Sequence, residues 1–382
     1  MDSIPKKIAL FHPWIKSKGG AERVILELLK KSRHNIDIYT WAYDRENTFQ
    51  EFENYKINVI SPLLGKKMSR FYILRGLFLP LSILKKIPLS RYDKLLISTS
   101  GIAEFLTFRN YKRGRTYAYV HTPLREASDK IVKWNLENRY SQKPLSKYLY
   151  LIAVKTYKIF EKIAWKRLDV VIFNSKLSKS RAEERNLIIN KESHVVYPPL
   201  SLSEFKTGED KKYFLYVSRL NPPKRQDVLI EAWKIFSEKH KEFKLVIIGT
   251  PENERYYREL LKSSAGIRSI EVKPYVSDKD LRTLYSHCTA GLFIGYQEDF
   301  GIVPLEILSS GKPLIAVDEG GYVELVKNHP HFHAIKERHT REEMIREIAT
   351  ELESFLKKRF PKKVEKIKVK SFINEMDQIL GK

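Results

Sequence analysis

The chain has 382 residues, 42% of them hydrophobic, and its 70 Lys and Arg against 46 Asp and Glu give a formal net charge of +24. Because single cores usually stop growing below this length, we expect two domains. The only cysteine, Cys288, excludes an internal disulfide, and the absence of a signal-peptide pattern predicts a reducing, cytoplasmic location.

The first half of the chain alternates short apolar strands with helical or loop segments. It opens with a strand at residues 7–11, a polar loop over 12–20 and a helix from Ala21. Gly19 and Gly20 allow a ligand close to the backbone. The loop lacks a Gly-x-Gly-x-x-Gly or P-loop pattern, so a dinucleotide or P-loop site is only weakly indicated. Further strands are expected at 36–39, 57–60, 95–98, 116–120 and 170–173.

The second half repeats this alternation after a proline-rich, polar stretch. We expect a first domain over 1–196, a linker over 197–212 and a second domain over 213–364. Strands of the second domain are expected at 213–217, 244–248, 270–272, 291–294 and 314–317, with helices between them. The simplest architecture is two facing doubly wound α/β domains with a cleft between them and ligands at the carboxyl ends of the strands.

The stretch 296–324 carries two carboxylates around the start of a short helix. Pro304 suits a first helical turn and Gly311 a stop, which predicts a helix over 303–310. Glu298 lies in the loop before it and Glu306 in its first turn, while the amides near Gly301 point outward. This arrangement suits sugar hydroxyls and phosphate, although an ordinary strand, loop and helix with solvated glutamates fits as well.

Other candidate residues follow strands directly. Arg219 and Lys224 come after the strand at 213–217 and before a helix, so two cations and a helix N-terminus can converge on a diphosphate. His121 follows the strand at 116–120, where it could hydrogen-bond a substrate hydroxyl or shuttle a proton. Loop cations are more often solvated and a lone histidine is more often structural.

The Asp-x-Asp at Asp278 and Asp280 resembles a metal-dependent sugar-transfer motif, but we reject that interpretation. It directly precedes a helical run, where Ser277 or Asp278 serves as the N-cap. No other cluster has the spacing of metal ligands, so we predict no metal and no cofactor.

The positive charge should attract anionic partners. Residues 62–91 mix basic and bulky apolar residues without an acidic one, as an interfacial membrane segment does. A helix over 147–166 places Lys155, Lys158, Lys162 and Lys166 on one face. Both segments also fit a core helix or a solvated face, and abundant Lys and Glu are typical of thermophile proteins. No apolar run reaches the roughly 18 residues of a membrane span.

In combination, these motifs resemble the retaining glycosyltransferases of family 4, which have the GT-B fold. The resemblance rests on Glu298 and Glu306 with seven residues between them, on Gly311-Lys312-Pro313 and 320–324, on 19–23, on Arg219 with Lys224, and on Asn174-Ser175. The stretches 119–125 and 197–199 look most like mannosyltransferases that build lipid-linked or surface glycans. Family members often return their last helix to the first domain, and residues 365–382 carry a helix with suitable apolar spacing.

The resemblance implies roles for individual residues. Glu306 would bind the nucleotide ribose and Glu298 the transferred sugar, with the residues after it, Phe300, Gly301, Ile302 and Val303, contributing backbone amides. Arg219 and Lys224 would bind the donor diphosphate. Asn221-Pro222-Pro223 stiffens the loop between them, so the direction of the Lys224 side chain is left open. Gly19 and Gly20 would admit the distal phosphate, His121 would lie beside the sugar, and Val276 would contact the base.

We therefore expect a metal-independent hexosyltransferase that uses a nucleotide sugar, GDP-mannose in the first place, and a lipid-linked or glycan acceptor at an anionic membrane surface. A UDP sugar with transfer of glucose or N-acetylglucosamine is the alternative, as is a phosphorylase or synthase on the same fold. A basic nucleic-acid-binding protein would also explain the charge, but no nucleic-acid motif supports it, and we expect no nucleic-acid partner.

Overall fold

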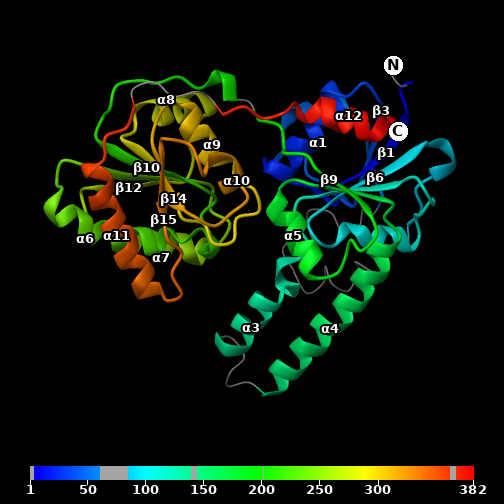
Figure 1. The fold of residues 1–382 in the computed structure, drawn as a ribbon, viewed down its shortest axis with the longest axis horizontal. Coiled ribbons are helices and arrows are strands. Elements are labelled where there is room, and N and C mark those ends of the chain that lie inside the picture. Colours follow the sequence, from blue (N-terminus) through cyan, green and yellow to red (C-terminus); the bar gives the residue numbers. More distant parts are fainter. Residues whose placement is uncertain (1–3, 61–84, 139–143, 201, 362–366) are drawn as a thin grey trace. The chain divides into compact units, whose positions relative to one another are not determined.

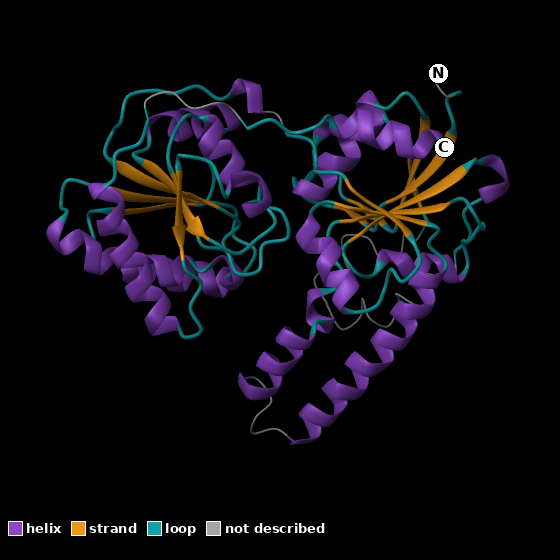
Figure 2. Cartoon of the chain, in the orientation of Figure 1, coloured by secondary structure: helices purple, strands orange, loops and turns teal. Residues whose placement is uncertain are grey.

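The computed structural model describes residues 4–60, 85–138, 144–200, 202–361 and 367–382. The chain divides into two compact units, the first made of residues 1–199 and 369–382 and the second of residues 200–368 (Figure 1). In each unit, helices cover both faces of a parallel sheet (Figure 2). Both faces of such a sheet are buried, which is why strands such as Lys94–Thr99 and Thr116–Val120 are buried along their whole length.

The first unit contains a seven-stranded sheet in the order β5-β3-β1-β6-β7-β8-β9. The chain starts at β1, the third strand in this order, and winds from it first to one edge and then to the other. Such a doubly wound sheet changes direction between β1 and β6, where ligands of this fold class bind. The strands are β1 (Lys7–Phe11), β3 (Asn35–Thr40), β5 (Ile57–Val59), β6 (Lys94–Thr99), β7 (Thr116–Val120), β8 (Val170–Phe173) and β9 (Glu192–Val195), and a separate pair is formed by β2 (Trp14–Ile15) and β4 (Ala42–Tyr43).

The helices of the first unit include a pair that extends away from the sheet (Figure 1). This pair is α3 (Asp129–Asn138) and α4 (Pro144–Lys166), and the other helices are α1 (Gly20–Lys31), α5 (Lys176–Glu184) and α12 (Phe372–Gly381). Short 3₁₀ turns lie at Gln50–Asn54, Leu89–Arg91, Ala103–Phe108 and Arg125–Ala127.

The second unit has six strands in the order β12-β11-β10-β13-β14-β15, the same winding around a central first strand. Its strands are β10 (Tyr213–Val217), β11 (Lys244–Ile248), β12 (Ile270–Lys273), β13 (Ala290–Phe293), β14 (Leu314–Val317) and β15 (Phe332–Ile335). Its helices are α6 (Gln226–Lys239), α7 (Glu254–Ser264), α8 (Asp278–His287), α9 (Ile302–Ser309), α10 (Val323–Val326) and α11 (Arg341–Lys357), with 3₁₀ turns at Leu202–Glu204 and Pro222–Lys224.

The last helix, α12, packs on the first unit, which confirms the return expected from the family resemblance. Met376 and Leu380 are fully buried in one core cluster with residues of β1 and α1. The carboxylate of Asp377 accepts hydrogen bonds from the hydroxyl of Ser32 at 2.5 Å and from the backbone N–H of Arg33 at 3.0 Å. The burial of apolar side chains and the hydrogen bonds of Asp377 together hold α12 against the end of α1.

The expected α/β architecture is confirmed, and the differences lie at edges and ends. The edge strands β9 and β15 were not predicted, because Glu192–Val195 and Phe332–Ile335 carry polar residues that a half-buried edge tolerates. The short helix α9 begins at Ile302 rather than at 303, since Gly301 has φ +84° and takes the N-cap. Glu306 is therefore the fifth residue of α9 and begins its second turn, not its first.

Candidate active site

In the second unit, Lys224 and Glu298 meet at the carboxyl edge of the sheet. Lys224 ends the 3₁₀ turn after β10, and Glu298 lies in the loop between β13 and α9. Their side chains form an ion pair in which both are largely buried. The hydroxyl of Tyr216 donates to the backbone carbonyl of Lys224, so the stiff turn Pro222–Lys224 directs the lysine at Glu298. Two residues predicted to bind the donor thus lie side by side.

Arg219, the second predicted cation, has a different partner. Its guanidinium donates to Glu252 at 2.5 Å, and Asn221 donates to the other oxygen of that carboxylate at 2.6 Å. The guanidinium is 61% exposed. Arg219 directly follows Ser218, whose backbone lies very close to Gly249 at the end of β11. A Cβ on Gly249 would lie 1.5 Å from the carbonyl oxygen of Ser218. Arg219 is therefore at the surface and tied to one carboxylate, whereas Lys224 is enclosed.

The helix α9 presents its N-terminus beside Glu298. A Cβ on Gly301 would lie 2.8 Å from the ring of Tyr322, so this close approach and the positive φ both require glycine. The backbone carbonyl of Glu298 accepts from the N–H of Gly321 at 3.1 Å, which joins the loop before α9 to the loop after β14. The amides of the first turn lack intrahelical partners and favour an anion or hydroxyl oxygen.

Glu306 is held by a tyrosine from the neighbouring helix α8. The hydroxyl of Tyr285 donates to one carboxylate oxygen of Glu306 at 2.9 Å. Ile302, Val303 and Glu306 are half-buried, while the side chain of Phe300 is only 4% exposed. Of these predicted donor residues, Phe300 can reach a ligand only through its backbone.

In the first unit, His121 belongs to a chain of hydrogen bonds that crosses three neighbouring strands. The Nε2 atom of His121, after β7, lies 2.8 Å from the hydroxyl of Ser98 on β6. The same hydroxyl lies 2.9 Å from Nδ1 of His12, which follows β1. Burial lowers the pKa of His12 to about 3, with a further lowering by His121, and burial lowers the pKa of His121 to about 4. Both imidazoles are therefore neutral near pH 7 and suited to hydrogen bonding.

The glycine loop of the first unit has an acidic neighbour. Gly19 is the N-cap of α1 and Gly20 its first residue, exposed to solvent. The carboxylate of Glu22 accepts from the hydroxyl of Ser17 at 2.8 Å, and a Cβ on Gly19 would lie 2.4 Å from that carboxylate. Glu22 is buried and complements the positive end of the helix. A side chain at position 19 would therefore displace the carboxylate of Glu22, whereas Gly20 is exposed and open to a ligand.

Several residues that contact the predicted site residues were not identified from the sequence. Ser98, Glu252 and Tyr285 each hydrogen-bond the side chain of a predicted site residue, and His12 is linked to His121 through Ser98. For His12 and Ser98 a signal existed, since each lies at the end of a predicted strand, as His121 does. No local pattern marks Glu252 or Tyr285, because the strand and helix packing alone brings them to Arg219 and Glu306.

The remaining predicted residues lie on other loops and helices. Val276 is half-buried between β12 and α8, and Ser277 caps α8 by accepting from the N–H of Asp280 at 3.1 Å. The predicted basic segment 62–91 lies outside the described residues up to 84. On α4, Lys155, Lys158 and Lys162 line one cavity, and Lys158 donates to Asp129 at 2.7 Å.

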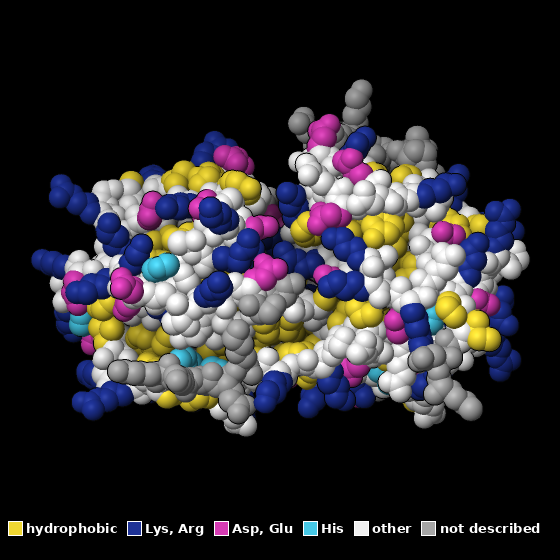
Figure 3. All heavy atoms as spheres, turned by 90° about the horizontal axis from the view of Figure 1, so that it is seen from above, with side chains coloured by type: hydrophobic (Ala, Val, Ile, Leu, Met, Phe, Trp, Pro, Cys, Tyr) yellow, Lys and Arg dark blue, Asp and Glu magenta, His cyan; other side chains and the backbone are white. Residues whose placement is uncertain are grey.

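Lys and Arg side chains are spread over both units on the face shown in Figure 3, with acidic and apolar groups between them. A groove that follows a nucleic-acid backbone would gather them along one track. Among the described residues, none of the helices combines the length and the apolar character that spanning a bilayer requires.

The chain is similar to known glycosyltransferases. Residues 202–370 match the family model of glycosyl transferases group 1. An alpha-1,3/1,6-mannosyltransferase, ALG2 of Dictyostelium discoideum, is 27% identical over 369 residues, which cover 84% of this chain and 83% of that protein. Among solved structures, WaaG, a glycosyltransferase involved in lipopolysaccharide biosynthesis, aligns with a TM-score of 0.62 at 14% identity over 91% of this chain and 90% of its own. Alr3699/HepE of Anabaena, in complex with UDP and glucose, aligns with a TM-score of 0.61 at 16% identity over 98% and 99%. These likenesses establish the GT-B fold.

Proposed function

We propose that this chain, a GT-B glycosyltransferase whose residues 202–370 match the group 1 family, transfers mannose from GDP-mannose to a hydroxyl of a lipid-linked glycan acceptor. The observation that carries the choice of sugar is the similarity over 84% of the chain to a mannosyltransferase. The enclosed Lys224 and Glu298 beside the N-terminus of α9 support sugar transfer as the reaction.

The reaction retains the configuration of the anomeric carbon. The bond from that carbon to the diphosphate oxygen breaks, and the acceptor oxygen bonds to the carbon on the same face. The leaving phosphate takes the proton of the acceptor hydroxyl, so the proposal assigns no protein nucleophile and no general base. Charge that builds on the diphosphate is stabilised by Lys224 and Arg219 in place of a metal. Both cations must exchange a carboxylate partner, Glu298 or Glu252, for the donor.

The other site residues bind and orient substrate. Glu306, positioned by Tyr285, accepts hydrogen bonds from the ribose hydroxyls. Glu298 and the amides from Phe300 to Val303 bind the transferred sugar, and Val276 contacts the base. In the first unit, Gly20 admits phosphate to the start of α1, and the neutral His121 hydrogen-bonds a substrate hydroxyl.

We place the enzyme in the cytoplasm, at the inner face of the cell membrane, where a lipid-linked acceptor resides. The net charge of +24 supports attraction to anionic lipid. The lysines of α4 and the basic segment 62–91 are the proposed contacts.

Hydrolysis of candidate donors tests the choice of sugar. Purified protein is incubated with GDP-mannose, UDP-glucose and UDP-N-acetylglucosamine, and released sugar is measured. We expect turnover of GDP-mannose, with the α-anomer released first when followed by NMR. A UDP sugar is the alternative, since a neighbour with this fold is seen with UDP and glucose. Exclusive use of a UDP sugar would remove the mannose proposal.

A further inference from the structure

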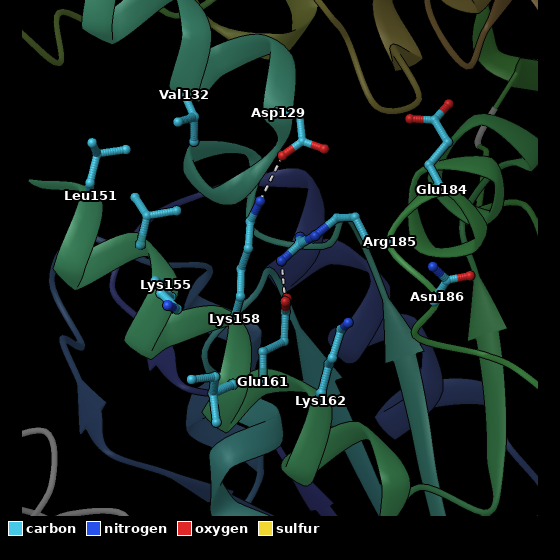
Figure 4. A pocket seen from close by; sticks show the side chains of 12 residues that line it. Asp129, Val132, Leu151, Lys155, Lys158, Glu161, Lys162, Glu184, Arg185 and Asn186 are labelled. Atoms are coloured by element: carbon cyan, nitrogen blue, oxygen red, sulfur yellow. Dashed lines mark hydrogen bonds and ion pairs between the residues drawn. The ribbon is translucent and has the colours of Figure 1, made fainter.

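A cavity of about 560 Å³ lies in the first unit between α3, α4 and the end of α5 (Figure 4). This volume falls within the range of about 300–1,000 Å³ that is typical of small-molecule sites. None of the residues proposed to bind the donor is part of its lining. The lining combines an apolar part, formed by Val132, Leu151, Val154 and Ile159, with several charged side chains.

The charges around the cavity are only partly paired. Lys158 donates to Asp129 at 2.7 Å, and Arg185 forms an ion pair with the buried Glu161, as the dashed lines in Figure 4 show. Within the described part of the chain, the exposed Lys155 and Lys162 have no ion pair or hydrogen bond through their ammonium groups. The unpaired acidic residue of the lining, Glu184, comes from α5 and lies across the cavity from α4. The α4 side of the mouth thus offers two available cations.

An apolar stripe continues from this cavity along the outside of α4. Its members lie at positions i, i+4, i+7, i+14, i+15 and i+18 of α4, which 3.6 residues per turn places on one side of the helix. Ile159, which lines the cavity, is 53% exposed and belongs to the stripe. The stripe comprises Leu145, Leu149, Ile152, Ile159, Phe160 and Ile163. Bulky apolar side chains beside unpaired lysines complement a molecule with a long hydrocarbon chain and a negatively charged head.

We propose that this cavity is the binding site for the phosphate-bearing lipid of the acceptor. The hydrocarbon nearest the phosphate lies against Leu151, Val154 and Ile159, the chain continues along the stripe, and Lys155 with Lys162 binds the phosphate or diphosphate. This rests on the proposed function, which supplies a lipid-linked acceptor. The chemistry required is an isoprenoid or acyl chain joined to phosphate, whereas a free phosphate would use the lysines alone.

Binding of farnesyl diphosphate to the full chain tests the site by calorimetry, with inorganic diphosphate and farnesol as separate probes. We expect farnesyl diphosphate to bind more tightly than either fragment. The double variant Lys155→Gln and Lys162→Gln should lower the affinity for farnesyl diphosphate roughly tenfold or more. A hydrogen bond to a charged group typically changes a binding constant by at least about tenfold. Leu151→Gln should lower the affinity for farnesyl diphosphate but leave the affinity for inorganic diphosphate unchanged.

Matched controls lie outside the cavity and the stripe. Lys147→Gln with Lys166→Gln removes the same charge from the same helix, and Ile189→Gln introduces the same amide at an exposed apolar position. The cavity proposal is wrong if the two double variants of lysine lower the affinity for farnesyl diphosphate equally. It is also wrong if both of them lower only the binding to phosphatidylglycerol vesicles. In either case α4 is a general basic surface. Hydrolysis of GDP-mannose should be unchanged in all of these variants. Lack of hydrolysis by the wild type would refute the proposed function and leave the binding result standing by itself.

Discussion

Lys224 is enclosed while Arg219 is exposed, and this difference sets what each cation can do. Lys224 pairs with Glu298 in a largely buried position, where electrostatic interactions are stronger than in solvent. Arg219 is 61% exposed and shares Glu252 with Asn221. The enclosed lysine should therefore contribute more to stabilising the leaving diphosphate.

Replacement of Lys224 tests this role. Lys224→Ala should lower kcat by about 100-fold or more, as loss of one preorganised charge usually does. Steady-state kinetics with GDP-mannose measure it, and Lys239→Ala, which breaks an exposed ion pair with Glu353, is the control. If the lysine only neutralised Glu298, Lys224→Ala would cause no further fall in kcat in a Glu298→Ala background, and we expect a further fall.

The two glutamates should affect different kinetic constants. In the proposed function, Glu306, held by Tyr285, binds ribose in the ground state and the transition state alike, so Glu306→Ala should raise KM about tenfold with little change in kcat. Glu298→Ala should mainly lower kcat. Tyr285→Phe keeps the carboxylate and should raise KM less than Glu306→Ala. The reverse assignment of the two constants would overturn these roles.

The buried histidines make the first unit sensitive to acid. The pKa values of His12 and His121 are lowered by burial to about 3 and about 4, below the ordinary value of 6.5. Between pH 6.5 and 4 the unfolded state therefore binds more protons than the folded state, and stability falls as the pH falls. Lowering the pH from 7 to 5 should cost about 2 kcal/mol for each histidine.

Urea unfolding at pH 7 and pH 5 measures this loss. His12→Gln should reduce the difference between the free energies of unfolding at the two pH values. An equal pH dependence in wild type and His12→Gln would show that the buried imidazole does not carry the effect.

At the scale of the element, the start of α9 depends on one glycine. Gly301 combines φ +84° with a neighbour, the ring of Tyr322, that a Cβ would approach to 2.8 Å. Gly301→Ala should cost about 1–3 kcal/mol in backbone strain alone and should also displace the first amides of α9, which raises KM for the donor.

Gly266 offers a matched control because it has φ +80° and open space around its Cβ position. Gly266→Ala should show the loss of stability without the change in KM. Thermal unfolding and donor kinetics on the two variants separate backbone strain from the shape of the site. Equal kinetics for both variants would refute a role for the α9 N-terminus.

At the scale of the whole molecule, the last residues of the chain, 369–382, belong to the first unit, although they follow the second unit in the sequence. Met376 is fully buried in the core cluster around α1. Met376→Ala should therefore destabilise the first unit by about 2–5 kcal/mol. Hydrogen exchange should detect lost protection in β1 and α1 but not in β10 or α6.

Leu352→Ala is the reciprocal control, since Leu352 is fully buried in the core of the second unit. It should lower protection in α6 and leave α1 unchanged. If Met376→Ala left the protection of α1 at the wild-type level, α12 would not be part of the folded core of the first unit.

The sequence by itself determined the alternation of buried strands and helices, the parallel winding and the motif around Glu298 and Glu306, because period, glycine and proline positions are local properties. It also placed His121 and Lys224 at strand ends. It missed β9 and β15, whose polar residues give little strand signal.

Only the tertiary structure decided which side chains meet. The contact of Lys224 with Glu298 spans 74 residues, and the link from His12 through Ser98 to His121 needs the strand order β1-β6-β7. The cavity requires α3, α4 and α5 together. Such contacts depend on strand order, register and helix packing, which arise from the burial of the whole chain and leave no local periodic pattern.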